Sequence, residues 1–127
     1  MIHVAVPVYN EDRTLGVLLW KIRKVMRGFG RDYQVVIVDD ASSDRTPAVL
    51  KRYSAFLPLR VLRTEARMGY GMALAWVIRD VVERSRYPKR DVVVTIQGDL
   101  TEDPEDMVAM VKMIEGGADL VAGAMDE

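Results

Sequence analysis

Two adjacent carboxylates, Asp39 and Asp40, follow a run of β-branched residues at 35–38. This run, VVIV, is typical of a strand that is buried on both faces in a parallel sheet. Neighbouring carboxylates repel each other and gain nothing from burial, so their place at a strand end needs a reason. A turn in which the side chain bonds its own backbone explains one of them. The pair, followed by ASSD, indicates a site that accepts hydrogen bonds from a ring N–H or a ribose hydroxyl.

A second acidic group follows the apolar run at 91–96 and includes Asp99, Glu102 and Asp103. Carboxylate oxygens suit hard cations such as Mg²⁺ or Mn²⁺, which also bridge the oxygens of a diphosphate. The alternative is that these acids only cap a helix that starts at Pro104. Capping accounts for Asp103 but explains Asp99 poorly.

The stretch PVYNED, which follows the first apolar run, carries an aromatic ring next to polar groups. Tyr9 could stack on a planar base, with Pro7 shaping the wall of the pocket. The same stretch is also explained by a strand-to-helix turn that Asn10 or Thr14 caps.

Glycine and arginine residues follow the third apolar run, in RTEARMGYG. Gly69 and Gly71 stand where a helix begins, and glycine lets the backbone approach a phosphate closely. A simple turn explains these glycines equally well. Arg63 and Arg67 could neutralise phosphate charge, although solvent-exposed arginines are the more common case.

These clusters must be positioned by elements that alternate along the chain. The runs at 2–8, 33–38, 59–64, 91–96 and 116–124 predict strands, and the stretches that begin near 14, 46, 69 and 103 have helical spacing. Thr46 and Pro47 predict a helix start, with a capping hydroxyl and a proline in the first turn. This order predicts a single α/β domain over 1–127, with a mainly parallel sheet and helices on both faces. Ligands bind such sheets beyond the carboxyl ends of the strands, where all four polar clusters fall.

Composition narrows the function classes. The chain has 127 residues, of which 50% are hydrophobic and 29% charged, and 18 Lys and Arg balance 19 Asp and Glu for a net charge of −1. The chain therefore lacks the excess of basic residues that would indicate a nucleic-acid partner. The absence of cysteine excludes disulfides and thiolate metal sites. The N-terminus lacks the basic leader of a signal peptide, and no apolar stretch is long enough to span a bilayer.

Two other nucleotide or phosphate folds fit less well. A dinucleotide-binding fold also places an acid after its second strand, but it needs a G-x-G-x-x-G fingerprint in the first turn, and PVYNED contains no glycine. A phosphoacceptor receiver domain carries its paired acids after the first strand, whereas Asp39 and Asp40 follow the second.

The ordered stretches VAVPVYNEDRTL, VVIVDDASSDRT, GYGMALAWVI, VTIQGDLTEDPEDM and GADLVAG together resemble family-2 glycosyltransferases. These are inverting enzymes with the Rossmann-like GT-A fold, which binds nucleotide-diphospho-sugars. The most similar members are the polyprenyl-phosphate glycosyltransferases, such as dolichol-phosphate mannose synthases. The resemblance covers essentially the whole chain.

The resemblance implies roles for individual residues. Pro7, Tyr9 and Glu11 match the family segment that lines the nucleotide base. Asp40 matches the acid that accepts a hydrogen bond from the base, and Asp39 supports the ribose side. We add Arg67 to this nucleotide-binding set on account of its charge, which could neutralise a phosphate, and not on account of the resemblance.

The metal motif departs from the family pattern. Asp99 matches the last acid of the D-x-D motif that holds the divalent metal on the donor diphosphate, but Gln97 stands where the motif begins with Asp. An amide oxygen still ligates a hard cation but brings no charge, so we expect Mg²⁺ or Mn²⁺ to bind weakly without donor. Thr101 stands where polyprenyl-phosphate relatives usually have a metal-binding Gln.

The implied function is transfer of a sugar from a UDP- or GDP-sugar to an acceptor, a polyprenyl phosphate in the most similar members. Family members continue beyond the point that matches Glu127 into an acceptor-binding half, so no residue here is assigned as the catalytic base. The alternative is a non-catalytic nucleotide-sugar-binding module. We expect a cytoplasmic protein, or one at the cytoplasmic face of the membrane that associates peripherally through segments outside this chain.

Overall fold

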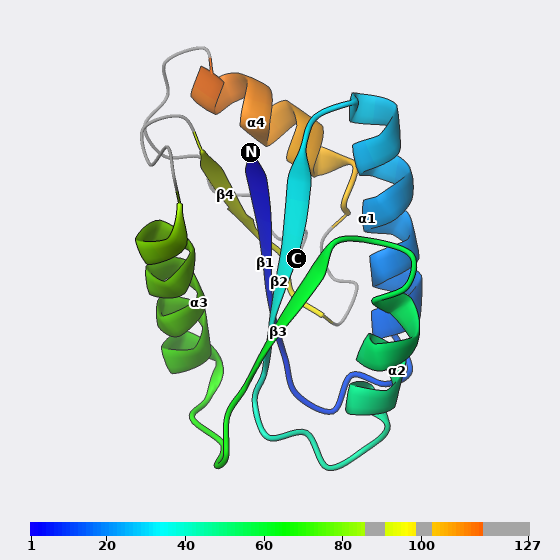
Figure 1. Ribbon diagram of the computed structural model, residues 1–127, viewed down its shortest axis with the longest axis vertical. Coiled ribbons are helices and arrows are strands. Elements are labelled where there is room, and N and C mark those ends of the chain that lie inside the picture. Colours follow the sequence, from blue (N-terminus) through cyan, green and yellow to red (C-terminus); the bar gives the residue numbers. More distant parts are fainter. Residues whose placement is uncertain (86–90, 99–102, 116–127) are drawn as a thin grey trace.

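The computed structural model describes residues 1–85, 91–98 and 103–115 (Figure 1). Within these residues four strands form one sheet: β1 (Ile2–Val8), β2 (Tyr33–Asp39), β3 (Leu59–Arg63) and β4 (Val92–Thr95). Every residue of β1 is buried, and so are the last five of β2, because these two strands lie in the middle of the sheet. The predicted strand at 116–124 lies outside the described residues.

The sheet is parallel throughout and has the strand order β3-β2-β1-β4. The chain moves outward from β1 through β2 to β3 and then returns to the other side of β1 for β4. Val4 therefore pairs with Val35 on one side and with Val94 on the other. A reversal of this kind creates a crevice beyond the carboxyl ends of the two strands that flank it, here β1 and β4.

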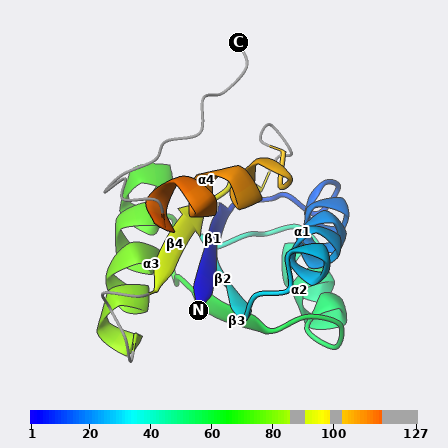
Figure 2. The same ribbon diagram turned by 90° about the horizontal axis from the view of Figure 1, so that it is seen from above.

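In the described part of the chain, four helices cover the two faces of the sheet (Figure 2). The helices α1 (Leu15–Phe29), α2 (Thr46–Tyr53) and α4 (Asp106–Glu115) pack with one set of strand side chains, which includes Val35 and Ile37. Helix α3 (Tyr70–Arg84) packs with the alternate set, which includes Val36 and Val38. Successive strand residues face opposite sides, so the VVIV run supplies both cores. The predicted α/β class with helices on both faces is confirmed.

The helix starts differ in detail from the prediction. Thr46 and Thr14 stand at the starts of α2 and α1, but neither hydroxyl caps its helix. Asp44 serves α2 instead, because its Oδ1 accepts the backbone N–H of Thr46 at 2.8 Å. Residues 104 and 105 form a turn, and α4 begins two residues later than Pro104 predicts.

Asp91 closes the opposite edge of the sheet, at the amino end of the parallel strands. Its Oδ2 accepts the Ser85 hydroxyl at 2.6 Å and lies 3.0 Å from His3 Nε2, while Oδ1 accepts the amine of Met1 at 3.0 Å. The Ser85 hydrogen bond, followed by those from His3 and the amine, holds the pKa of Asp91 well below its usual value against the opposing effect of burial. Asp91 thus fastens the start of β4 to the start of β1.

Candidate functional site

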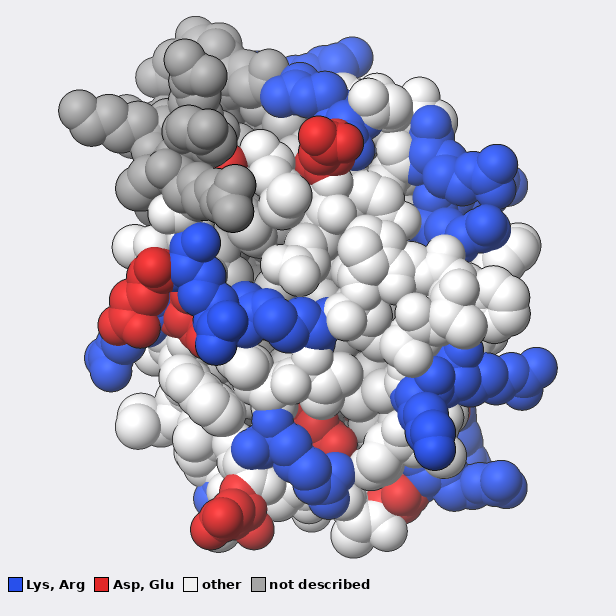
Figure 3. All heavy atoms as spheres, viewed as in Figure 1, with Lys and Arg blue, Asp and Glu red and all other residues white. Residues whose placement is uncertain are grey.

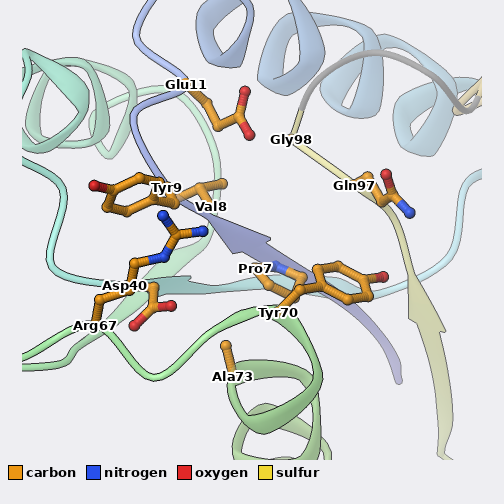
Figure 4. Close-up of a pocket in the computed structure, with 10 residues that line it drawn as sticks. All are labelled: Pro7, Val8, Tyr9, Glu11, Asp40, Arg67, Tyr70, Ala73, Gln97 and Gly98. Carbon is orange, nitrogen blue, oxygen red and sulfur yellow. The ribbon is translucent and has the colours of Figure 1, made fainter.

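A pocket of about 290 Å³ lies beyond the carboxyl ends of β1 and β4, at the crevice that the strand order creates. It is lined by Pro7, Val8, Tyr9, Glu11, Asp40, Arg67, Tyr70, Ala73, Gln97 and Gly98 (Figure 4). These residues come from the segments at the carboxyl ends of β1, β2 and β4, from the loop before α3 and from the first turn of α3 itself. The fold therefore brings Pro7, Tyr9, Glu11, Asp40, Arg67 and Gln97, which the sequence singles out at separate positions, into one cavity.

Asp40 is buried and accepts hydrogen bonds from the loop that leads into α3. Its Oδ1 accepts the backbone N–H of Met68 at 2.8 Å and the hydroxyl of Thr64 at 3.0 Å, and its Oδ2 accepts the backbone N–H of Gly69 at 2.8 Å. A carboxylate offers about four acceptor sites, so these three donors leave one on Oδ2. Asp40 can therefore fix the loop and still accept an N–H from a ligand.

The protonation state of Asp40 follows from the same contacts. Burial alone raises the pKa of this carboxyl, but the N–H groups of Met68 and Gly69, the Thr64 hydroxyl and the charge of Arg67 more than offset burial. The pKa of Asp40 is consequently below its ordinary value, and Asp40 is ionised at neutral pH. An ionised carboxylate is an acceptor only, which suits recognition of a donor N–H.

The guanidinium of Arg67 lies over the ring of Tyr9, with Cζ 3.6 Å from the ring centroid. This is a cation–π contact at short range. Figure 4 shows the guanidinium between the Tyr9 ring and the carboxylate of Asp40. The gap between Tyr9 and Asp40 thus accommodates a flat group that carries N–H donors.

Asp39 points away from this pocket. Its Oδ2 forms an ion pair with Arg63 at 2.7 Å, and its Oδ1 accepts the backbone N–H of Ser42 at 3.1 Å. Asp39 is 1% exposed, and it is not one of the described residues that line the pocket. Arg63, which the sequence offered as a phosphate-neutralising cation, neutralises Asp39 instead. A contact of Asp39 with a ribose stays a prediction.

The loops after β1 and β2 are joined by hydrogen bonds that the sequence pattern did not predict. The backbone N–H of Asn10 donates to Ser42 Oγ at 3.0 Å, and that of Glu11 donates to Thr46 Oγ1 at 3.0 Å. In return the Asn10 Oδ1 accepts the backbone N–H of Ser43 at 2.8 Å. Asn10 has φ of 49°, a left-handed conformation that asparagine tolerates better than most residues. Polar residues of ASSDRT therefore hold the loop that carries Tyr9.

Gly98 brings the end of β4 close to the first loop. A Cβ at this position would lie 2.8 Å from Val8 Cγ1, so glycine is required for the close approach. The Thr14 hydroxyl donates to the carbonyl oxygen of Gly98 at 2.7 Å and fixes this approach. Gly98, Tyr70 and Ala73 are pocket residues that the sequence analysis did not select. A glycine directly after Gln97 could have indicated a close approach of the backbone at position 98. Tyr70 and Ala73 of α3 could not be selected, because only the packing of the helix on the sheet brings them to the pocket.

Of the two residues predicted to bind a metal, Gln97 lies within the described residues. Gln97 lines the pocket together with Glu11, and an amide oxygen and a carboxylate are donors that suit Mg²⁺ or Mn²⁺. Asp99 lies outside the described residues. Within 1–85, 91–98 and 103–115 no group of three or more acidic or histidine side chains could hold a metal ion.

Comparison with protein families identifies the chain. The model of "Glycosyl transferase family 2" matches residues 3–127. The chain belongs to this family. The parallel sheet and the helices of the described residues accordingly have the GT-A fold, as the resemblance implied.

Two curated relatives are transferases named for polyprenyl phosphates. The chain is 31% identical over 120 residues to the undecaprenyl-phosphate 4-deoxy-4-formamido-L-arabinose transferase of Edwardsiella ictaluri, which covers 94% of this chain and 35% of the relative. It is 32% identical over 123 residues to the dolichol-phosphate mannosyltransferase of Pyrococcus furiosus, with 97% of this chain and 32% of the relative covered. The chain thus spans about a third of the length of these relatives.

A solved structure shows the same fold with a donor in place. The mannosyltransferase of Pyrobaculum calidifontis, solved in complex with GDP-Man and Mn²⁺, matches with a TM-score of 0.63 and 27% identity, over 85% of this chain and 30% of the other.

No helix among the described residues of this family-2 member is long and apolar enough to cross a membrane.

Proposed function

We propose that this chain is the donor-binding domain of a glycosyltransferase that moves a sugar from a UDP- or GDP-sugar to a polyprenyl phosphate. The observation that carries the proposal is the convergence of Tyr9, Asp40, Arg67 and Gln97 in one pocket at the crevice between β1 and β4. The names of the curated relatives supply the acceptor class, and the complex with GDP-Man supports the donor class. We treat 1–127 as a single domain.

The base is proposed to bind in the gap between Tyr9 and Asp40. The guanidinium of Arg67 occupies this gap 3.6 Å from the Tyr9 centroid, and it shares with a nucleobase a planar shape and N–H donors. Base binding would therefore exchange one planar donor for another, with the free acceptor site of Asp40 Oδ2 taking a ring N–H. Arg67 released from Tyr9 remains close enough to neutralise phosphate charge.

The diphosphate is proposed to lie toward Gln97 and Gly98, at the end of β4. Gln97 and Asp99 would hold a Mg²⁺ or Mn²⁺ ion there, and Glu11 is a further oxygen donor in the lining. The ion would neutralise the charge that develops on the diphosphate leaving group. Gln97 brings no charge, so the anionic oxygens of the donor are expected to complete the site, and binding of metal and donor is reciprocal.

Calorimetric titration with UDP, GDP, UDP-glucose and GDP-mannose, with and without Mn²⁺, tests the donor class. Wild type should bind one base better than the other, and Asp40→Asn should weaken binding about 5- to 150-fold, which corresponds to about 1–3 kcal/mol for a lost buried hydrogen-bond partner. Asp32→Asn changes the same chemical group at the opposite edge of the sheet and should leave the affinity unchanged. Equal affinity of wild type and Asp40→Asn would remove Asp40 from the site.

The metal assignment has its own test. Mn²⁺ should bind wild type weakly alone and more tightly with nucleotide, whereas Gln97→Asp should bind Mn²⁺ without nucleotide. Asp99→Ala should lose Mn²⁺ in both conditions. Unchanged Mn²⁺ affinity of Asp99→Ala with nucleotide present would leave Asp99 as a helix-capping residue.

A further inference from the structure

The outer surface of α1 and α2 carries positive charge without acidic neighbours on either helix. The two helices contain six basic residues and no Asp or Glu; the basic residues are Lys21, Arg23, Lys24, Arg27, Lys51 and Arg52. All but the half-buried Arg23 are exposed. Figure 3 shows Lys and Arg gathered on the side where Figure 1 places α1 and α2. We call the surface formed by these six residues the basic face.

The charges of the basic face are not neutralised by the described part of the protein. Lys21, Lys24, Arg27, Lys51 and Arg52 form no ion pair with any described residue. On the other side of the sheet, Asp80 of α3 pairs with both Arg84 and Arg60. The protein has a net charge of only −1, so the basic face reflects a segregation of charge and not a general excess.

Exposed apolar side chains lie within the basic face. Val17, Trp20 and Phe56 are 48%, 53% and 55% exposed. Arg23 connects Trp20 and Phe56, because its guanidinium carbon lies 5.3 Å from the centroid of Trp20 and its Nε donates to the carbonyl oxygen of Phe56 at 2.9 Å. The Tyr53 ring packs edge-on against the Phe56 ring, with 6.3 Å between the two ring centroids. One continuous patch therefore combines aromatic rings with basic side chains.

We propose that the basic face docks on an anionic phospholipid bilayer. Tryptophan and phenylalanine stabilise membrane binding because their apolar rings are buried at the level of the headgroups. Lys and Arg around them are attracted to anionic lipids. Duplex nucleic acid, which is bound mainly through its phosphates, would need the charges but not Trp20 and Phe56. A second copy of the chain is a poorer occupant because two basic faces repel each other.

The basic face is separate from the donor pocket. The pocket is lined by residues from the ends of β1, β2 and β4 and from the start of α3, and none of its lining residues belongs to α1 or α2. Docking through these helices therefore leaves the pocket open at the edge of the sheet, beside the bilayer surface. This inference rests on the charges and exposures and would stand if the donor proposal failed.

Co-sedimentation with vesicles tests the proposal on the 127-residue chain. We expect binding to phosphatidylglycerol–phosphatidylcholine vesicles that falls steeply with salt, and little binding to phosphatidylcholine alone. Lys24→Glu with Arg27→Glu should weaken binding at least tenfold. The matched control, Arg79→Glu with Lys112→Glu, makes the same change in net charge on other exposed helix positions and should keep binding.

Fluorescence then reports insertion directly. The chain has two tryptophans, so Trp76→Phe leaves Trp20 as the reporter. Trp20 emission should shift to shorter wavelength with anionic vesicles and be quenched by brominated lipid, and Trp20→Ser should weaken binding with unchanged circular dichroism.

Four outcomes would overturn the proposal. These are absence of binding to anionic vesicles, equal binding to neutral vesicles, equal loss in the matched control, and binding to heparin or self-association through the basic face without vesicle binding. Nucleotide titration without vesicles judges the donor pocket separately, so failure of one proposal is distinguishable from failure of the other.

Discussion

Asp39 and Asp40 can be neighbours at the end of β2 because each carboxylate is stabilised by a different partner set. Arg63 and the Ser42 N–H stabilise Asp39, while the Met68 and Gly69 N–H groups stabilise Asp40. Repulsion between the two charges is thus offset residue by residue. Asp40 lines the pocket and Asp39 does not, so Asp40 is the member of the pair that we propose to contact a base.

Asp40→Asn should lower stability in a pH-dependent way. The amide cannot accept all three hydrogen bonds, so unfolding free energy at neutral pH should fall by about 1–3 kcal/mol. The pKa of Asp40 is lowered in the folded state, so the charged form stabilises the fold above the unfolded pKa of about 3.9. That contribution is lost as pH falls from this value through the depressed folded pKa.

Urea denaturation between pH 7 and pH 2.5 measures this difference. The gap between wild type and Asp40→Asn should be constant near neutrality and shrink below about pH 4. Asp32→Asn, whose carboxyl is exposed, should show no comparable gap at any pH. A gap that stays the same down to pH 2.5 would contradict the role of the charge.

At the scale of elements, the sequence was sufficient to predict the strands and helices that the structure describes, but not the hydrogen bonds between their loops. The run at 35–38 and the position of Asp40 after it follow from hydrophobic pattern alone, and so does the edge where the pocket lies. The hydrogen bond from Glu11 N–H to Thr46 Oγ1 joins residues 35 positions apart. Local capping preferences assign the Thr46 hydroxyl to its own helix, because they contain no information on which loops meet. In the structure the Thr46 hydroxyl accepts the N–H of Glu11 and does not cap α2.

Gly98 tests how closely β4 must approach the first loop. Gly98→Ala places a Cβ 2.8 Å from Val8 Cγ1 and 3.3 Å from Glu11 Cγ, and Val8 is buried. We expect a loss of about 1–3 kcal/mol from overpacking, with weaker nucleotide binding because the pocket wall moves. Thermal unfolding and calorimetric titration measure the two effects.

Gly71 provides the matched control for this change. It lies in the first turn of α3 with no atom within 4 Å of an added Cβ, so Gly71→Ala should raise stability by up to about 1 kcal/mol. Equal effects of the two substitutions would show that Gly98 serves backbone flexibility and not close approach.

At the scale of the whole molecule, the strand order decides where chemistry can occur. The reversal between β3 and β4 leaves one crevice at the carboxyl edge, and the pocket lies there, while Asp91 fastens the opposite edge. The order could not be read from hydrophobic pattern, because β4 could pair with β1 or with β3 on that evidence. The polar clusters after the strands nevertheless predicted the edge at which the pocket lies.

The last prediction concerns the division between donor binding and sugar transfer. We propose that the pocket binds a nucleobase and a diphosphate, and no described residue is assigned as the catalytic base that would deprotonate or orient an acceptor. The chain spans about a third of the length of its curated relatives. Since transfer requires the acceptor to be held in line, about 3–3.5 Å from the sugar carbon, we expect the purified chain to bind donor without transferring it at an enzymatic rate. Labelled sugar transfer to undecaprenyl or dolichyl phosphate measures this, with a longer family-2 relative as the positive control. Robust transfer by the 127-residue chain, abolished in Asp40→Asn, would place the acceptor-side chemistry within these residues.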